Sequence, residues 1–167
     1  MMRHENPDRF VYRDDVQATY DRLTGSTIVG LPDVKPEAPL LIDISVTNRC
    51  SGGCSFCYQD ARPDGQDAPY EAVLEQLARI HPAPFQVALG GGEPANWPDL
   101  FRFIGGLGSM GIDATITAGP GINSDGLWHL GMLTQDETLK AVGVSLGDDE
   151  QLFFRTADEC NGKAVAH

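Results

Sequence analysis

Three cysteines lie within eight positions, at residues 50, 54 and 57, directly after an apolar and β-branched run. This run, residues 40–46, has the composition of a buried strand, so the cysteines are expected in the loop at its carboxyl end. Three thiolates from one short loop can hold a cubane iron-sulfur cluster and leave the fourth iron open to a ligand. Gly52 and Gly53 let the backbone bend around such a cluster. The loop therefore predicts a site and not a piece of hydrophobic core.

The alternative for a chain with four cysteines is a pair of disulfides. Disulfides staple small secreted chains, whereas a tight cysteine group without a secretion signal is more often metal-binding or catalytic. Zinc is less apt, because structural zinc sites prefer four protein ligands. Cys160 stands apart from the group and is expected to be an incidental thiol, with an auxiliary cluster ligand as the alternative.

The charge of the chain restricts its partners. Twelve Lys and Arg stand against 24 Asp and Glu, for a net charge of −12. Nucleic-acid binding depends on clustered basic side chains, so we expect no nucleic-acid partner. No apolar run approaches the roughly 20 residues that cross a bilayer, and residues 1–7 lead into no signal peptide. We therefore expect a soluble, cytoplasmic protein with no membrane partner.

From residue 40 onward, strand and helix patterns alternate, which predicts an α/β fold of parallel strands with right-handed crossovers. Trp128 and the phenylalanines of the second helix are expected in the core. Asp67 is the expected cap of the first helix, and Pro98 opens the second. The expected strands are residues 40–46, 85–89, 112–118 and 139–146, and the expected helices are residues 67–80, 98–110 and a short one around 127–130.

Within these strands, polar residues alternate with apolar ones. Asp43 and Ser45 interrupt the first strand, and Thr115 and Thr117 interrupt the third. A closed barrel packs its interior with branched apolar residues. A partly polar second face instead suits an open, curved sheet that lines a wet cavity.

The chain divides into an extension, residues 1–39, and a core, residues 40–167. The extension has one expected hairpin, in which residues 18–20 and 27–29 flank a turn at 24–26. It is either a lid or substrate-docking segment, or a strand pair that covers one end of the core. Residues 147–167 are expected to form at most one more helix, with no further strand.

A second unusual loop, Gly90-Gly91-Gly92-Glu93-Pro94, follows the second strand. Sites in parallel α/β folds gather at the carboxyl ends of the strands, so this loop and the cysteine loop are expected side by side. Glycines let backbone approach a ligand closely, and Glu93 can accept hydrogen bonds from an ammonium group. The pair of loops predicts an amino-acid-like ligand beside an open iron.

These two loops resemble the motifs of the radical S-adenosylmethionine (SAM) enzymes. That family has Cys-x3-Cys-x2-Cys with an aromatic residue before the third cysteine, matched by Cys50, Cys54, Phe56 and Cys57. Its glycine-glycine-glutamate-proline motif is matched by residues 91–94. The resemblance implies a partial (β/α) barrel, of which this chain holds about four of the usual six strand-helix units.

The resemblance also implies roles for single residues. Cys50, Cys54 and Cys57 would ligate a 4Fe-4S cluster, and Phe56 would lie by the adenine of SAM. Gly91, Gly92 and Glu93 would receive its amino group, and Ser145 would reach its ribose. Reductive cleavage of SAM would give a 5'-deoxyadenosyl radical that abstracts a substrate hydrogen, an oxidoreductase-type activity in which the cofactor carries the chemistry.

The resemblance further implies an electron donor, such as flavodoxin or ferredoxin, and a small-molecule or peptide substrate. Residues 47–49 before the first cysteine, and Tyr58 after the third, look like the branch with peptide-modifying maturases. This chain lacks some of the family's usual strand-helix units, which implies an absent carboxyl-terminal region or a partner chain. In addition, Thr117-Ala118-Gly119 departs from the Thr-Asn-Gly that many members of the family carry. The alternative function is a non-catalytic iron-sulfur or SAM-binding module that acts as a scaffold or partner subunit.

Overall fold

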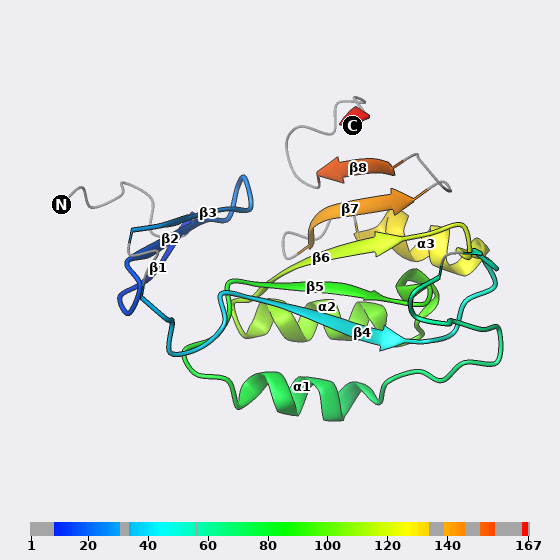
Figure 1. Cartoon of the computed structure of the whole chain (residues 1–167), viewed down its shortest axis with the longest axis horizontal. Helices are drawn as coiled ribbons and strands as arrows, with labels where there is room; N and C mark the ends of the chain where they lie inside the picture. The colour runs from blue at the N-terminus through cyan, green and yellow to red at the C-terminus, as the bar shows by residue number, and fades with distance from the viewer. Residues whose placement is uncertain are drawn as a thin grey trace.

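The computed structural model of the chain describes residues 9–30, 34–55, 57–133, 139–145, 151–155 and 165–166. It contains a small amino-terminal sheet and a larger sheet flanked by helices (Figure 1). The elements, in chain order, are β1 (Phe10–Arg13), β2 (Ala18–Asp21), β3 (Ser26–Val29), β4 (Leu41–Thr47), α1 (Tyr70–Ala78), β5 (Gln86–Gly91), the 3-10 helix η1 (Pro94–Asn96), α2 (Leu100–Ser109), β6 (Asp113–Ala118), α3 (Ser124–Leu133), β7 (Leu139–Ser145), β8 (Gln151–Arg155) and β9 (Val165–Ala166).

The larger sheet has the strand order β4-β5-β6-β7-β8-β9. Its first four strands are parallel, with Ile44 opposite Leu89 and Leu89 opposite Ile116. The expected parallel α/β arrangement is therefore confirmed, with strand bounds within two residues of those expected. No pairing joins β4 to β9 in the described part of the chain, so the sheet is open there.

Two strands lie where none was expected. β8 pairs antiparallel with β7, and β9 pairs antiparallel with β8. The expectation of no further strand after residue 146 was wrong. Parallel strands need a long crossover, whereas an antiparallel strand needs only a short connection, and β8 begins only six positions after the last residue of β7.

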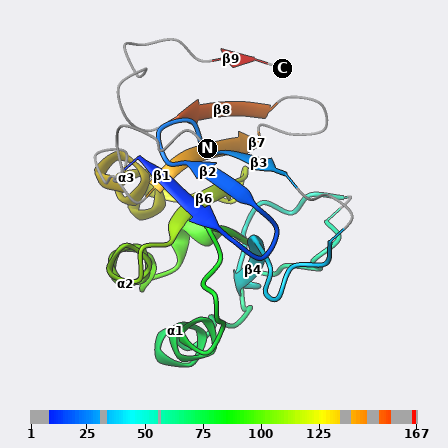
Figure 2. The ribbon, with the colours of Figure 1, turned by 90° about the vertical axis from the view of Figure 1, so that its left-hand side faces the viewer.

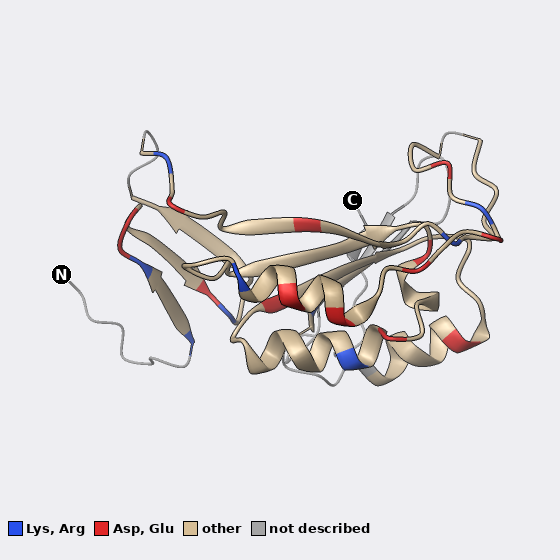
Figure 3. Ribbon diagram, turned by 90° about the horizontal axis from the view of Figure 1, so that it is seen from below, with Lys and Arg blue, Asp and Glu red and all other residues tan. Residues whose placement is uncertain are grey.

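The helices lie along one face of the six-stranded sheet, as the end-on view shows (Figure 2). From below, α1 and α2 run side by side under the strands (Figure 3). The core between the helices and the sheet is apolar, and Leu77 of α1, Ile104 of α2 and Val87 of β5 are buried members of one hydrophobic cluster. On the opposite face of β4, Asp43 and Ser45 are exposed, as the alternation predicted. No helix in the described ranges is long and apolar enough to span a membrane.

Two side chains differ from their expected places. Trp128 of α3 is 61% exposed, and its ring lies against the partly buried Phe101, whereas Trp97 is buried. Asp67 does not cap α1, because the residue at the cap position is Pro69 and no side chain caps the helix. The Asp67 carboxylate accepts a hydrogen bond from Thr47 Oγ1 at 2.7 Å instead. It closes a loop and does not begin a helix.

The amino-terminal sheet lies at the amino ends of the parallel strands, opposite the cysteine loop (Figure 1). β2 pairs antiparallel with β3 as expected, with Ala18 opposite Val29, and also with β1, which was not expected. The Tyr20 ring stacks on Phe85, which directly precedes β5, with 5.2 Å between the ring centroids. A lid over the cysteine loop would lie at the other end, so this placement favours the covering role.

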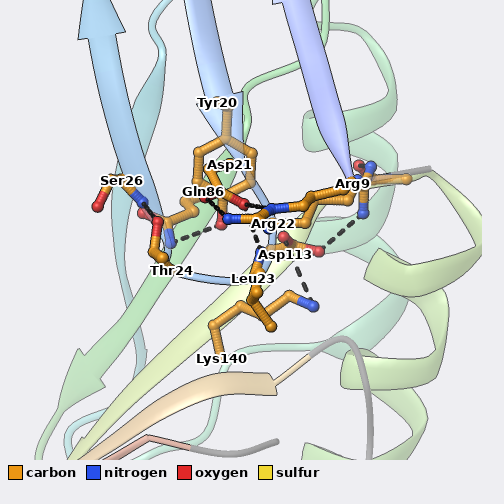
Figure 4. Close-up of polar contacts among 11 residues, drawn as sticks. Arg9, Tyr20, Asp21, Arg22, Leu23, Thr24, Ser26, Gln86, Asp113 and Lys140 are labelled. Atoms are coloured by element: carbon orange, nitrogen blue, oxygen red, sulfur yellow. Dashed lines mark hydrogen bonds and ion pairs between the residues drawn. The ribbon is translucent and has the colours of Figure 1, made fainter. Parts of the chain in front are cut away.

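Polar contacts bind this sheet to the core (Figure 4). Arg22 donates hydrogen bonds to the Asp113 carboxylate at 2.9 Å and to the Gly111 carbonyl at 2.7 Å. Lys140 Nζ lies 3.9 Å from the second oxygen of the buried Asp113. Gln86 donates to the Tyr20 hydroxyl at 2.8 Å. The small sheet is therefore tied to β5 and β6, and Lys140 of β7 lies beside the Asp113 carboxylate that Arg22 contacts.

Candidate functional site

The cysteine loop leaves β4 at its carboxyl end and is closed on itself at its base. Arg62 donates its backbone N–H to the Asn48 carbonyl at 3.0 Å, and Cys50 donates its own to the Arg62 carbonyl at 2.9 Å. The Thr47–Asp67 contact closes the base further, and Arg49 forms an ion pair with Asp67. The segment that carries the thiols is thus held at both of its ends.

The three thiols of the loop are free. Cys50 and Cys54 are half-buried, whereas Cys57 is exposed. Cys50 Sγ accepts a hydrogen bond from the Gly52 N–H at 3.3 Å, an interaction that favours the thiolate. Burial has the larger effect and raises the pKa of the Cys50 thiol, and Glu93 and the neighbouring cysteines raise it further.

Gly91 and Gly92 lie where the loop after β5 meets the end of β4. A Cβ on Gly91 would lie 2.2 Å from the Thr47 carbonyl oxygen, and its φ of +121° excludes ordinary side chains. A Cβ on Gly92 would lie 2.5 Å from the Arg49 carbonyl oxygen. The Gly92 N–H donates to Thr47 O at 2.7 Å. The glycines are therefore required for close packing between the two loops, whatever ligand they also contact.

Glu93 is fully buried at the start of η1. Its carboxylate accepts hydrogen bonds from the Gly119 N–H at 2.6 Å and from the Ala95 N–H at 3.2 Å. Its own N–H donates to the Arg49 carbonyl at 2.9 Å. Burial raises the pKa of Glu93 to about 7, against the two backbone donors that lower it. Both carboxylate oxygens already have protein partners, so an incoming ammonium group would add to these bonds or replace one.

Sequence reasoning noted Gly119 only as part of a departure from a family pattern and gave the loop between β6 and α3 no place in the site. Gly119 and Gly121 of this loop contact Glu93 and Cys50, respectively. The signal was present in the sequence, because Gly119-Pro120-Gly121 directly follows a strand of the parallel sheet. A third loop at the same edge completes the site.

One expected site residue, Phe56, lies outside the described residues, and so does Cys160, the expected incidental thiol. Ser145 ends β7, and the register that places Ala118 opposite Val144 puts it at the same edge of the sheet as the three loops. Its backbone position agrees with the expected role, while the contact with a ribose stays a prediction.

The donor set fits an iron-sulfur cubane. Among the described residues, no three His, Cys, Asp or Glu side chains converge closely enough to hold a single metal ion. A cubane does not require such convergence, because each thiolate binds a different iron. Three free thiols on one loop, with a backbone N–H directed at one sulfur, are the kind of ligands and hydrogen bonds that such clusters use.

Comparison with protein families matches residues 44–142, more than half of the chain, to the radical SAM superfamily. The matched region begins in β4 and ends in β7, so it includes all three loops of the site. No curated protein sequence matches the chain significantly.

Solved structures of one protein are also similar. SuiB from Streptococcus suis bound to S-adenosylmethionine is 20% identical with a TM-score of 0.48, and the match covers 62% of this chain and 24% of SuiB. SuiB bound to its precursor peptide SuiA is 22% identical, with the same TM-score and the same coverage. The chain thus spans about a quarter of the length of these neighbours.

Proposed function

The chain belongs to the radical SAM superfamily, and from this premise we propose that it binds a 4Fe-4S cluster through Cys50, Cys54 and Cys57 and takes part in radical chemistry with SAM. The observation that carries the proposal is the arrangement of the two motifs. The thiol loop after β4 and the Gly91–Glu93 loop after β5 are joined by backbone hydrogen bonds at the same edge of the sheet.

When bound, the cluster and SAM together supply the chemistry, which is one-electron cleavage of SAM to methionine and a 5'-deoxyadenosyl radical for hydrogen abstraction. The protein's own contribution is to position these groups. The three cysteines would hold the cluster, and the Gly91–Glu93 loop, which is hydrogen-bonded to the segment before the thiols, is proposed to receive the amino group of SAM. Phe56 is proposed for the adenine and Ser145 for the ribose.

Cluster binding is tested by anaerobic reconstitution of the chain, followed by iron and sulfide analysis. We expect about four irons per chain for the wild type. Alanine at Cys50, Cys54 or Cys57 should lower the iron content strongly. Cys160→Ala is the matched control, because it removes a thiol outside the motif, and it should retain the iron. A colourless wild-type protein, or an equal loss of iron in Cys160→Ala, would contradict the assignment of the three cysteines as cluster ligands.

Activity is tested separately, by the formation of 5'-deoxyadenosine from SAM under strongly reducing conditions. An enzyme forms this product, whereas a scaffold or partner subunit that only binds the cluster forms none. We propose a flavodoxin or ferredoxin as the natural electron donor, because one-electron reduction is required and Cys57 is exposed on the thiol loop. Dithionite replaces the donor in the assay.

We further propose that the substrate is a peptide. Support comes from Thr47-Asn48-Arg49 before the first cysteine and Tyr58 after the third, which resemble the peptide-modifying branch of the family. Candidate precursor peptides incubated with the reconstituted chain and SAM should change mass in a SAM-dependent manner. No change on any candidate, while 5'-deoxyadenosine still forms, would reject the peptide and retain the radical chemistry.

A further inference from the structure

The carbonyl oxygen of Gly121 joins two parts of the site that are far apart in sequence. It accepts a hydrogen bond from Ser51 Oγ at 3.2 Å and another from Asn96 Nδ2 at 2.9 Å. Ser51 directly follows the first cysteine of the thiol loop, and Asn96 ends η1 after the glutamate loop. One buried backbone group in the β6–α3 loop thus connects both motifs.

Asn96 holds this third loop at two points. Besides its bond to Gly121, its Oδ1 accepts a hydrogen bond from the Asn123 N–H at 3.0 Å. The first turn of α3 packs closely on the same side chain, since a Cβ on Gly126 would lie 2.3 Å from Asn96 Oδ1. The side chain uses both its donor and its acceptor within residues 119–123, so its contacts fix the position of that loop.

The loop of residues 119–123 packs directly against Cys50. A Cβ on Gly121 would lie 2.3 Å from Cys50 Sγ and 2.9 Å from the Gly52 nitrogen. Only a glycine leaves room for the sulfur there. Cys57, in contrast, is exposed and belongs to the open side of the thiol loop.

We propose that Asn96 is a positioning residue that, by holding the Gly121 backbone against Cys50 and Ser51, sets the position of the first cluster ligand. This inference rests on the proposed function, in which Cys50 binds iron. The side-chain hydrogen bonds of Asn96 go to Gly121 and Asn123, so it acts through the loop of residues 119–123.

The test uses the full chain without cluster, so that its readout does not depend on iron or SAM. The rate of alkylation of each thiol by iodoacetamide is measured by peptide mass spectrometry under anaerobic conditions. Cys54 and Cys57 in the same molecule serve as references. Asn96→Ser is neutral and too short to keep both hydrogen bonds. We expect it to raise the Cys50 rate relative to Cys57 about fivefold, the factor for one hydrogen bond of ordinary net strength.

Asn123→Ser is the matched control. The substitution is chemically the same and lies on the same loop, but a serine still accepts the hydrogen bond that Asn123 Oδ1 takes from the Gly126 N–H at the start of α3. We expect the ratio of the Cys50 rate to the Cys57 rate to stay at the wild-type value. An equal change in both variants, or a uniform acceleration of all three thiols, would overturn the proposal.

Ser51→Ala gives a second route, because it removes the other hydrogen bond to the Gly121 carbonyl. It should change the Cys50 rate in the same direction as Asn96→Ser. In the double variant, the factor by which the Cys50 alkylation rate changes should be smaller than the product of the factors for Asn96→Ser and Ser51→Ala. The reason is that both side chains act on the same carbonyl group. Independent effects, or no effect of Ser51→Ala, would contradict the shared role of Gly121.

Failure of this inference can be told from failure of the proposed function. A chain that binds no cluster and yet shows the selective change at Cys50 would overturn the function and support the role of Asn96. A chain that binds the cluster and cleaves SAM, with an unchanged Cys50 rate in Asn96→Ser, would overturn the role of Asn96 alone. In the reconstituted protein, Asn96→Ser but not Asn123→Ser should alter the spin-resonance spectrum of the reduced cluster.

Discussion

Glu93 accepts a hydrogen bond from the backbone N–H of Gly119 at 2.6 Å, so one buried carboxylate joins the loops that follow β5 and β6. The same residue donates its own N–H to the Arg49 carbonyl beside the thiol loop. Glu93 therefore contacts all three loops of the site. Any role that it has toward SAM is added to this structural one.

The first prediction concerns the pH dependence of stability. Burial raises the pKa of Glu93 from 4.5 to about 7, so the folded chain holds this proton more tightly than the unfolded chain. The resulting stabilisation is full below about pH 4.5 and is lost as the pH rises through about 7. Its size is on the order of 3 kcal/mol.

Glu93→Gln has no proton to lose, and so its free energy of unfolding should fall less between pH 5 and pH 8 than that of the wild type. Urea denaturation of both proteins without cluster, at four pH values under reducing conditions, measures the difference. The other titrating groups are common to both chains and cancel. Parallel pH profiles would show that Glu93 does not titrate in this range.

The second prediction contrasts two glycines. Gly91→Ala would place a Cβ 2.2 Å from the Thr47 carbonyl oxygen at a positive φ, and we expect it to destabilise the fold by about 3 kcal/mol or more. Gly105→Ala, in exposed space on α2, should stabilise it by about 0.5–1 kcal/mol, because alanine favours helix. Thermal unfolding of the two variants should therefore shift in opposite directions. A tolerated alanine at Gly91 would mean that the two loops can move apart.

The third prediction concerns the amino-terminal sheet. Arg22→Ala would remove a hydrogen bond from the buried Asp113 carboxylate and leave Lys140 as the neighbouring cation, and we expect a loss of about 2 kcal/mol in the free energy of unfolding. Arg79→Ala is the control, since it removes an exposed ion pair with Glu75 on α1 and should cost about 0.5 kcal/mol or less. Urea denaturation measures both. Similar small losses would show that the sheet contributes little to the stability of the core.

The sequence allowed the parallel strands and both motif loops to be predicted, because these features are local. Ile42 and Ile44 alternate with polar residues on β4, and α2 places Leu100, Ile104 and Leu107 on one face. Such periodic patterns depend on residues close together in the chain. The cysteines and Glu93 were found for the same reason, since each lies in a loop that follows a strand.

The missed features depend on contacts between distant residues. Asn96 and Gly121 are 25 residues apart, and no local pattern links an amide to one particular carbonyl. β1 is four residues long, and its pairing with β2 decides its structure. Asp67 has the residue type of a helix cap, but Thr47 and Arg49 on the neighbouring segment engage its carboxylate instead.

The last prediction follows from that placement of Asp67. Its carboxylate closes residues 48–66, the segment that carries the thiols, and α1 has no side-chain cap to lose. Asp67→Ala should therefore speed amide hydrogen exchange in this segment about tenfold and leave exchange in α1 unchanged. Asp64→Ala, an exposed acid of the same segment, is the control and should leave both regions as in the wild type. Faster exchange in α1 with an unchanged thiol segment would instead assign Asp67 to the helix, as its sequence position first indicated.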